Sequence, residues 1–449
     1  MCNLNVCKQK TGIVIILLAF VVLSLSTRRF IDGNHFSRLG LLEAIVHRGD
    51  YALSNDAAAQ TTGVVSVNNK QYSDKAPGVV LLALPAYWLA SKVSSACGLE
   101  PQHSRWFRES IGIICVLPYC VLGLIACFAA LECLVSKASV LIWGIACFCL
   151  PPVLYFTNVL MPHGMSVSFL WMAFYFILRK SDNSSRVFSA CCGGICAGFA
   201  VACEYDALIC AVMILHTRQA SPWQWFAWYL GCAIGMIPIL INNFLVYSEF
   251  FVVPYTGNQY FPHMRQGLAG VTFVPDVVNL LQSLFSLRKG IFPWNLSLLT
   301  GWVVAGIAIK SNIRLVSLSI TVILAHVLTM SSYQLPDAGG WVGARLLCPM
   351  VPWLLVVGAI GCQLSRRATY IAFAAVCVSC ATAMLIVANG GEATQDSTLQ
   401  AQVSHLLQAA GSAASGPVEM LRIGCGGMAF VTLCLTSKLL LGQQDCNVQ

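Results

Sequence analysis

The stretch that decides the fold joins the polar segment QYSDKAPG (residues 71–78) to the apolar run VVLLALPAYW (residues 79–88). A junction of this kind is typical of a chain that passes from water into a membrane. A lone lysine, Lys75, stands beside an acid just before the run and is followed by a Pro-Gly turn. A compact cation held at a membrane surface suits a phosphate that projects from lipid headgroups. The stretch therefore predicts a membrane protein with an anion-binding loop.

The composition of the whole chain agrees with a membrane protein. Of its 449 residues, 57% are hydrophobic and 10% are charged, a balance far from that of soluble domains. The net charge of +8 comes from basic residues in short clusters between apolar runs. Such clusters indicate topology and contact with anionic lipid, so we predict no nucleic-acid partner.

The 22 cysteines lie mostly inside apolar runs, without the paired spacing of a zinc site. We therefore expect small packing residues and no disulfide framework. No outer loop carries an Asp-x-Asp pair, so we also predict no metal site.

The apolar runs and the basic clusters between them predict the topology. Residues 12–25 form a first span, which we interpret as an uncleaved signal anchor, and residues 28–78 follow as a loop on the outer side. The positive-inside rule places the basic cluster at 179–186 in the cytoplasm, but four crossings from the outer loop would place it outside. The run at 79–93 is short and contains a proline, so we predict an interfacial or re-entrant helix there.

With that choice the fold class is all-α, with about twelve transmembrane helices in a single domain over residues 1–449. Residues 187–217 are too long for one span and are broken at 203–206, which predicts two short helices that meet on the outer side. The other spans are expected at 111–134, 138–156, 162–178, 223–246, 292–309, 315–333, 346–363, 368–388 and 421–441. Further outer loops are expected at 247–291, 334–345 and 389–420.

Several polar residues that are distant in sequence fall on the outer side in this topology, and such residues near a membrane are functional candidates. They are Asp32, Lys75, Arg108, His163, Glu204 and Arg345. Each residue also has an interpretation without a role in function. The acids can be interfacial carboxylates, the histidine can be structural, and the basic side chains can extend along the interface to reach water.

Three segments, DGNH (residues 32–35), GDY (49–51) and YSDKAPG (72–78), resemble in order the first extracytoplasmic loop of the GT-C glycosyltransferases. The bacterial aminoarabinose transferases and the protein O-mannosyltransferases are notable examples. The turns MPHG (161–164) and GGWVGAR (339–345) resemble those of uncharacterised bacterial members.

The resemblance implies roles for the candidate residues. In that family, the acid after the first helix and the lysine of the turn face a polyprenyl-phosphate sugar. Asp32 is the carboxylate nearest the first span, but an ungapped register from Gly49 puts Asn34 at the position of the acid, so both stay candidates for the catalytic residue. Glu43 and Asp56 are the reserves. Glu204 belongs to a segment that lines the acceptor or donor site, and the resemblance assigns substrate binding to Tyr72, Lys75, Arg108, His163, Trp341 and Arg345.

The resemblance further implies an inverting, metal-independent transfer of a sugar from a polyprenyl-phosphate carrier. The acceptor is a lipid, glycan or protein at the outer face of the inner membrane, and the lipid-linked donor takes the place of a cofactor. Two other hypotheses stay open. One is a secondary transporter of an anionic or lipid-linked substrate, which predicts inverted repeats and charges near the bilayer midplane. The other is a scaffold subunit that has lost its catalytic base.

Overall fold

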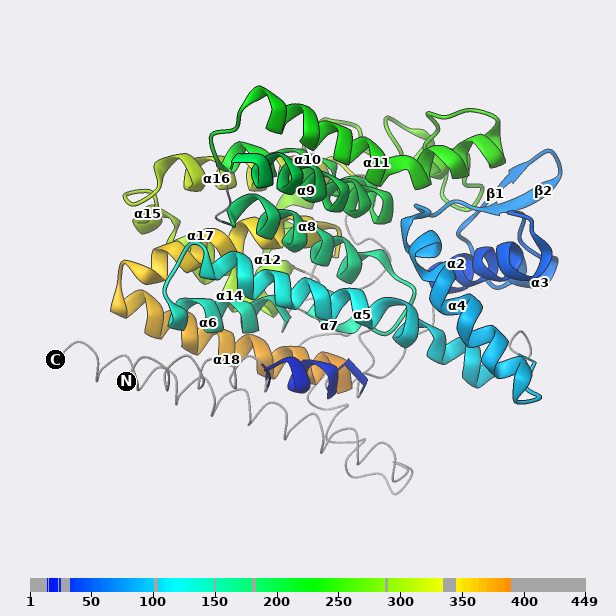
Figure 1. Cartoon of the computed structure of the whole chain (residues 1–449), viewed down its shortest axis with the longest axis horizontal. Helices are drawn as coiled ribbons and strands as arrows, with labels where there is room; N and C mark the ends of the chain where they lie inside the picture. Colours follow the sequence, from blue (N-terminus) through cyan, green and yellow to red (C-terminus); the bar gives the residue numbers. More distant parts are fainter. Residues whose placement is uncertain are drawn as a thin grey trace, which may run out of the picture.

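The computed structural model describes residues 14, 16–22, 24, 25, 33–100, 104–148, 151–179, 183–286, 290–333 and 345–388. The described chain is mostly helical, and its helices pack side by side in one bundle (Figure 1). The predicted span at 421–441 and the predicted loop at 389–420 lie outside the described residues.

The first loop carries its own small structure at one end of the bundle (Figure 1). It contains the helices α2 (Gly33–Glu43) and α3 (Asn55–Ala59), a π-helical turn η1 (Ala44–Arg48), and the strands β1 (Val64–Val67) and β2 (Lys70–Ser73). The strands form an antiparallel hairpin. Its turn residues Asn68 and Asn69 have φ angles of 50° and 63°, the left-handed conformation that asparagine tolerates and that tight hairpins require. The prediction of an all-α fold is therefore corrected by this one hairpin.

Most helices of the bundle lie on predicted apolar runs, but the predicted spans at 138–156 and 292–309 are each divided into shorter helices. The helices of the bundle are α4 (Gly78–Ala96), α5 (Arg105–Glu132), α6 (Lys137–Phe148), α7 (Pro151–Tyr155), α8 (Pro162–Leu178), α9 (Asn183–Cys203), α10 (Leu208–Val212), α11 (Pro222–Tyr247), α12 (Val277–Phe285), α13 (Ile291–Trp294), α14 (Leu296–Val303), α15 (Ala305–Ala308), α16 (Ile313–Ser331), α17 (Val351–Gln363) and α18 (Arg366–Ala388). The short 3-10 turns are η2 (Tyr205–Ala207), η3 (Ile214–Thr217), η4 (Pro254–Gly257), η5 (Pro262–Arg265) and η6 (Arg345–Met350). The predicted break at 203–206 is confirmed, because α9 ends at Cys203 and η2 follows.

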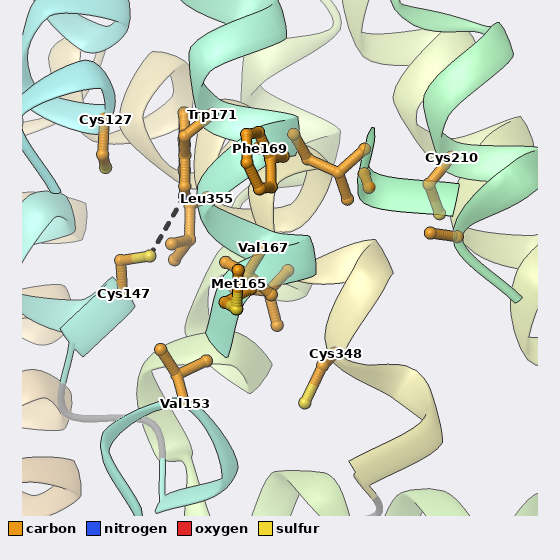
Figure 2. Packing of buried hydrophobic residues seen from close by; sticks show 14 of the residues in the cluster. Cys127, Cys147, Val153, Met165, Val167, Phe169, Trp171, Cys210, Cys348 and Leu355 are labelled. Atoms are coloured by element: carbon orange, nitrogen blue, oxygen red, sulfur yellow. Dashed lines mark hydrogen bonds between the residues drawn. The ribbon is translucent and has the colours of Figure 1, made fainter. Parts of the chain in front are cut away.

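The centre of the bundle is α8, which is buried along most of its length. Figure 2 shows Met165, Val167, Phe169 and Trp171 of α8 among side chains from neighbouring helices. The indole Nε1 of Trp171 donates to the Sγ of Cys147 on α6 at 3.1 Å. Cysteines such as Cys127 and Cys147 are fully buried, in agreement with a packing role.

The helices α9 and α11 pack closely through glycines. A Cβ atom at Gly198 would overlap the carbonyl oxygen of Cys232, and a Cβ atom at Gly235 would overlap that of Ile195. Small residues on both helices let the backbones approach, as is common for helices that associate in membranes.

The glycine contact predicts a stability effect. Gly198→Ala is expected to lower the thermal unfolding temperature by several degrees, because two packed backbones must separate to admit the methyl group. Gly306→Ala is the matched control, since a Cβ atom there meets nothing within 4 Å. Equal unfolding temperatures for the two variants in detergent would contradict the close approach of α9 and α11.

Six helices of the described chain are long and apolar enough to cross a membrane. They include α4, which has 19 residues. Three shorter apolar helical segments lie at Pro162–Leu178, Tyr205–Thr217 and Leu296–Ala308. The total of about twelve crossings and the interfacial or re-entrant position of 79–93 therefore stay predictions.

The topology can be tested by labelling single cysteines in a cysteine-depleted variant. If 79–93 does not cross, the basic cluster at 179–186 lies in the cytoplasm. A cysteine at position 183 is then expected to resist a membrane-impermeant maleimide added from outside, whereas a cysteine at position 70, in the exposed end of the hairpin, reacts. Labelling of position 183 from outside would show that α4 crosses.

Candidate active site

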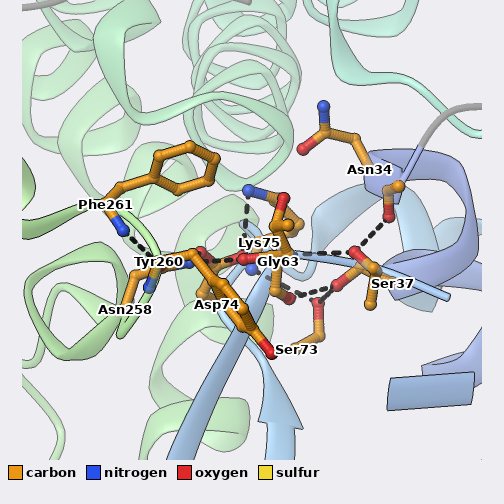
Figure 3. Close-up of polar contacts among 12 residues, drawn as sticks. Asn34, Ser37, Gly63, Ser73, Asp74, Lys75, Asn258, Tyr260 and Phe261 are labelled. Atoms are coloured by element: carbon orange, nitrogen blue, oxygen red, sulfur yellow. Dashed lines mark hydrogen bonds and ion pairs between the residues drawn. The ribbon is translucent and has the colours of Figure 1, made fainter. Parts of the chain in front are cut away.

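The predicted anion-binding loop is ordered by a buried polar network. The Nζ of Lys75 lies 3.0 Å from Oδ1 of Asp74, and both side chains are almost fully buried. The Nδ2 of Asn258 donates to Oδ2 of Asp74 at 2.5 Å and to the carbonyl oxygen of Thr62 at 2.8 Å. Figure 3 shows Asp74 turned toward Asn258, which belongs to the segment that follows α11. The network therefore joins the first loop to a segment far away in sequence.

The hairpin is also tied to α2. The hydroxyl of Ser37 donates to the carbonyl oxygen of Gly63 at 2.6 Å and lies 2.7 Å from the hydroxyl of Ser73 (Figure 3). The backbone N–H of Asp74 donates to the same carbonyl at 3.2 Å. These bonds satisfy buried polar groups and fix where β2 ends, and hence where Lys75 begins the turn into α4.

Lys75 is a buried cation held among charged and aromatic groups. Burial lowers the pKa of its ammonium group, Asp74 opposes that shift, and the guanidinium groups of Arg38 and Arg345 add to it. The Nζ also lies 5.1 Å from the centroid of the Tyr255 ring, a cation–π distance. A lysine that merely reaches along an interface to water would not be enclosed in this way.

A second buried pair joins α8 to the end of α9. The Nδ1 of His163 lies 2.6 Å from Oε2 of Glu204, and the two side chains are 4% and 11% exposed. His163 is in the first turn of α8, and Glu204 follows the last residue of α9. Asp206 lies two residues further, with both carboxylate oxygens buried. The predicted candidates His163 and Glu204 are thus direct neighbours.

Backbone contacts bring the two pairs to one region. A Cβ atom at Gly78, three residues after Lys75, would overlap the carbonyl group of Ala202, so α4 begins directly against the end of α9. Aromatic rings make a second link, because the rings of Tyr255 and Tyr205 are 5.9 Å apart at their centroids in an edge-to-face arrangement. Tyr255 lies beside Lys75 and Tyr205 follows Glu204.

Arg38 completes this region, although no sequence motif selects it. It lies on α2, is 2% exposed, and makes hydrogen bonds from Nη1 to the carbonyl oxygen of Asn34 at 3.2 Å and to the sulfur of Met161 at 3.6 Å. Its Nε is buried without a hydrogen-bond partner, and none of the ion pairs among the described residues involves it. A buried guanidinium without a carboxylate is costly, which makes Arg38 a candidate ligand for an anion.

Arg345 begins η6, which packs against α8 and η2. It acts electrostatically on both Lys75 and His163, as Arg38 does. The described residues therefore bring Arg38, Lys75 and Arg345 together as three basic groups near the His163–Glu204 pair.

Of the remaining predicted residues, Asn34 adjoins Arg38, and the others lie elsewhere or outside the described part. Arg108, near the start of α5, has its Nε 3.5 Å from Oε1 of Glu43 and its Nη2 3.3 Å from Oε1 of Gln60. Tyr72 is half-buried on β2, opposite Val65. Asn34 lies one helical turn before Arg38 on α2. Asp32 and Trp341 lie outside the described residues, and the roles of all five stay predictions.

Comparisons with known proteins identify the fold. No protein-family model and no curated protein sequence matches the chain. A structure of ArnT from Cupriavidus metallidurans bound to undecaprenyl phosphate is similar, with a TM-score of 0.50 and 14% identity over 98% of this chain and 78% of the ArnT chain. A structure of the same protein in the apo state has a TM-score of 0.49 and 15% identity over 94% and 76% of the two chains. The expected GT-C-like architecture is confirmed at the level of the fold, and the chain is a multi-pass membrane protein with an ArnT-like fold.

Proposed function

We propose that this protein transfers a sugar from a polyprenyl-phosphate carrier to an acceptor at the outer face of the inner membrane. The observation that carries the proposal is the group of three basic residues, Arg38, Lys75 and Arg345, whose charges act on one another in an apolar helical protein. Arg38 is buried without an acidic partner among the described residues, so a bound anion would supply the missing charge. The similar ArnT structure that is bound to undecaprenyl phosphate supports a polyprenyl phosphate as that anion.

The charges suit the chemistry of such a transfer. When the bond between the anomeric carbon and the phosphate oxygen breaks, negative charge grows on the phosphate. Fixed cations that face this charge stabilise the transition state more than the ground state. Arg38 and Arg345 provide forked donors for phosphate oxygens, and Lys75 provides a compact charge. We propose an inverting and metal-independent reaction, with Asp32 or Asn34 positioned to orient the acceptor.

The test is a direct search for the reaction. The purified protein in liposomes is mixed with extracted undecaprenyl-phosphate sugars and with lipid, glycan and peptide acceptors. The expected result is release of undecaprenyl phosphate and a sugar-bearing product detected by mass spectrometry. Protein-dependent movement of the donor across the liposome without any product would contradict the proposal and favour the transporter. Binding of undecaprenyl phosphate without turnover or movement would favour the scaffold subunit.

A further inference from the structure

The pair formed by His163 and Glu204 has the arrangement of a general base with an orienting carboxylate. The Nδ1 of His163 and Oε2 of Glu204 are 2.6 Å apart, with both side chains almost fully buried. A carboxylate at Nδ1 favours the tautomer that carries its hydrogen there, which leaves Nε2 as the proton acceptor. None of the hydrogen bonds among the described residues involves Nε2 of His163, so this nitrogen keeps its lone pair for a proton.

The pair is placed beside the basic residues that are proposed to hold the donor phosphate. Arg38 contacts Met161, two residues before His163, through its Nη1. The charges that act on His163 are those of Glu204, which follows α9, Arg38 of α2 and Arg345 of η6. The thiol of Cys120 on α5 lies beside the next residue, Gly164, and the ring of Phe156 lies 4.8 Å from that of His163. A reacting group held by Arg38 would therefore lie close to the imidazole.

We infer that His163, oriented by Glu204, accepts the proton of the acceptor hydroxyl in the proposed transfer. The hydroxyl oxygen forms a bond to the anomeric carbon, and the bond from that carbon to the phosphate oxygen breaks with its electron pair leaving on the phosphate. The proton passes to Nε2 of His163, and the imidazolium that forms is stabilised by the Glu204 carboxylate. It then passes to water, so the products are the glycosylated acceptor, undecaprenyl phosphate and a released proton. This inference rests on the proposed function and assigns the deprotonation to the first turn of α8 and to the residue that follows α9, apart from the first loop.

The experiment compares turnover, donor affinity and pH dependence for His163→Gln and Glu204→Gln. Loss of a general base typically lowers the rate by about 10²–10⁴-fold, so kcat is expected to fall by at least about a hundredfold in His163→Gln. The dissociation constant for undecaprenyl phosphate is expected to change little, because Arg38, Lys75 and Arg345 are intact. The wild-type pH–rate profile should show an acid limb of unit slope, which His163→Gln removes and the control His47→Gln, beside Tyr87, retains.

The outcomes separate the two proposals. Glu204→Gln keeps the shape of the side chain, and it supplies the test if His163→Gln does not fold. Its expected result is a smaller kcat with the donor affinity preserved. An active wild type together with variants that retain kcat and the acid limb would overturn the role of His163 and leave the proposed function standing. A wild type that binds no undecaprenyl phosphate would overturn the proposed function, and with it the reaction that needs this base.

Discussion

Replacement of Lys75 or Arg345 by alanine is expected to lower donor turnover about a hundredfold or more, the typical cost of removing a preorganised charge stabiliser. Lys75 is buried beside Asp74 and Tyr255, and so its ammonium group is held in position before the donor arrives. In solution, water molecules would have to reorganise before they could stabilise the phosphate to the same extent. The measurement is kcat for release of undecaprenyl phosphate, together with the thermal unfolding temperature of each variant.

The control for this experiment lies on the same hairpin. Lys70 forms an ion pair with Asp50 at 3.6 Å, and these side chains are 60% and 45% exposed. An exposed pair of this kind contributes little to stability, so Lys70→Ala should keep both turnover and the unfolding temperature. Lys75→Ala and Arg345→Ala could instead fold normally and turn over donor at the rate of Lys70→Ala. Lys75 and Arg345 would then act only as charges that set the orientation of the chain in the membrane.

Much of the architecture could be predicted because membrane helices follow from local composition. Apolar runs and the basic residues between them anticipated helices such as α5, α8, α11 and α16. The acidic residues at 204 and 206 also marked the end of α9, since two carboxylates interrupt an apolar run only where the helix breaks or meets water. The hairpin was missed, although the pair Asn68 and Asn69 after the valine-rich run at 64–67 is a typical turn signal.

The candidate site could be predicted in part. Lys75 and Arg345 stood out because turn residues surround them, and His163 and Glu204 because they interrupt apolar runs. Their pairing could not be predicted, because it depends on how α8 meets α9 in space. Arg38 had no local signal, since an arginine in a short amphipathic helix usually faces water. The same limit applies to Arg108, whose ion pair with Glu43 depends on the packing of α2 near α5.

Arg38→Gln is expected to weaken binding of undecaprenyl phosphate about a hundredfold, while the ligand-free protein becomes as stable as the wild type or more stable. Removal of one partner of a buried charge pair costs 2–5 kcal/mol or more in binding, about 30-fold or more in affinity. The effect on stability has the opposite sign. Arg38 is 2% exposed and has no carboxylate partner among the described residues, so a neutral side chain of similar length avoids the cost of burying the charge.

A loss of affinity without a loss of stability distinguishes an arginine that binds an anion from an arginine that supports the fold. If Arg38 mainly supported the fold through Asn34 and Met161, its replacement would lower the unfolding temperature and leave the affinity of the folded fraction unchanged. Binding is measured with undecaprenyl phosphate in nanodiscs, and stability by thermal unfolding with and without it. Arg48→Gln is the control, because that exposed arginine bonds to the backbone of Ala52 on the same loop and should change neither quantity. A stabilised Arg38→Gln variant that no longer gains stability from undecaprenyl phosphate is the expected result, since a ligand raises stability only through the state that binds it.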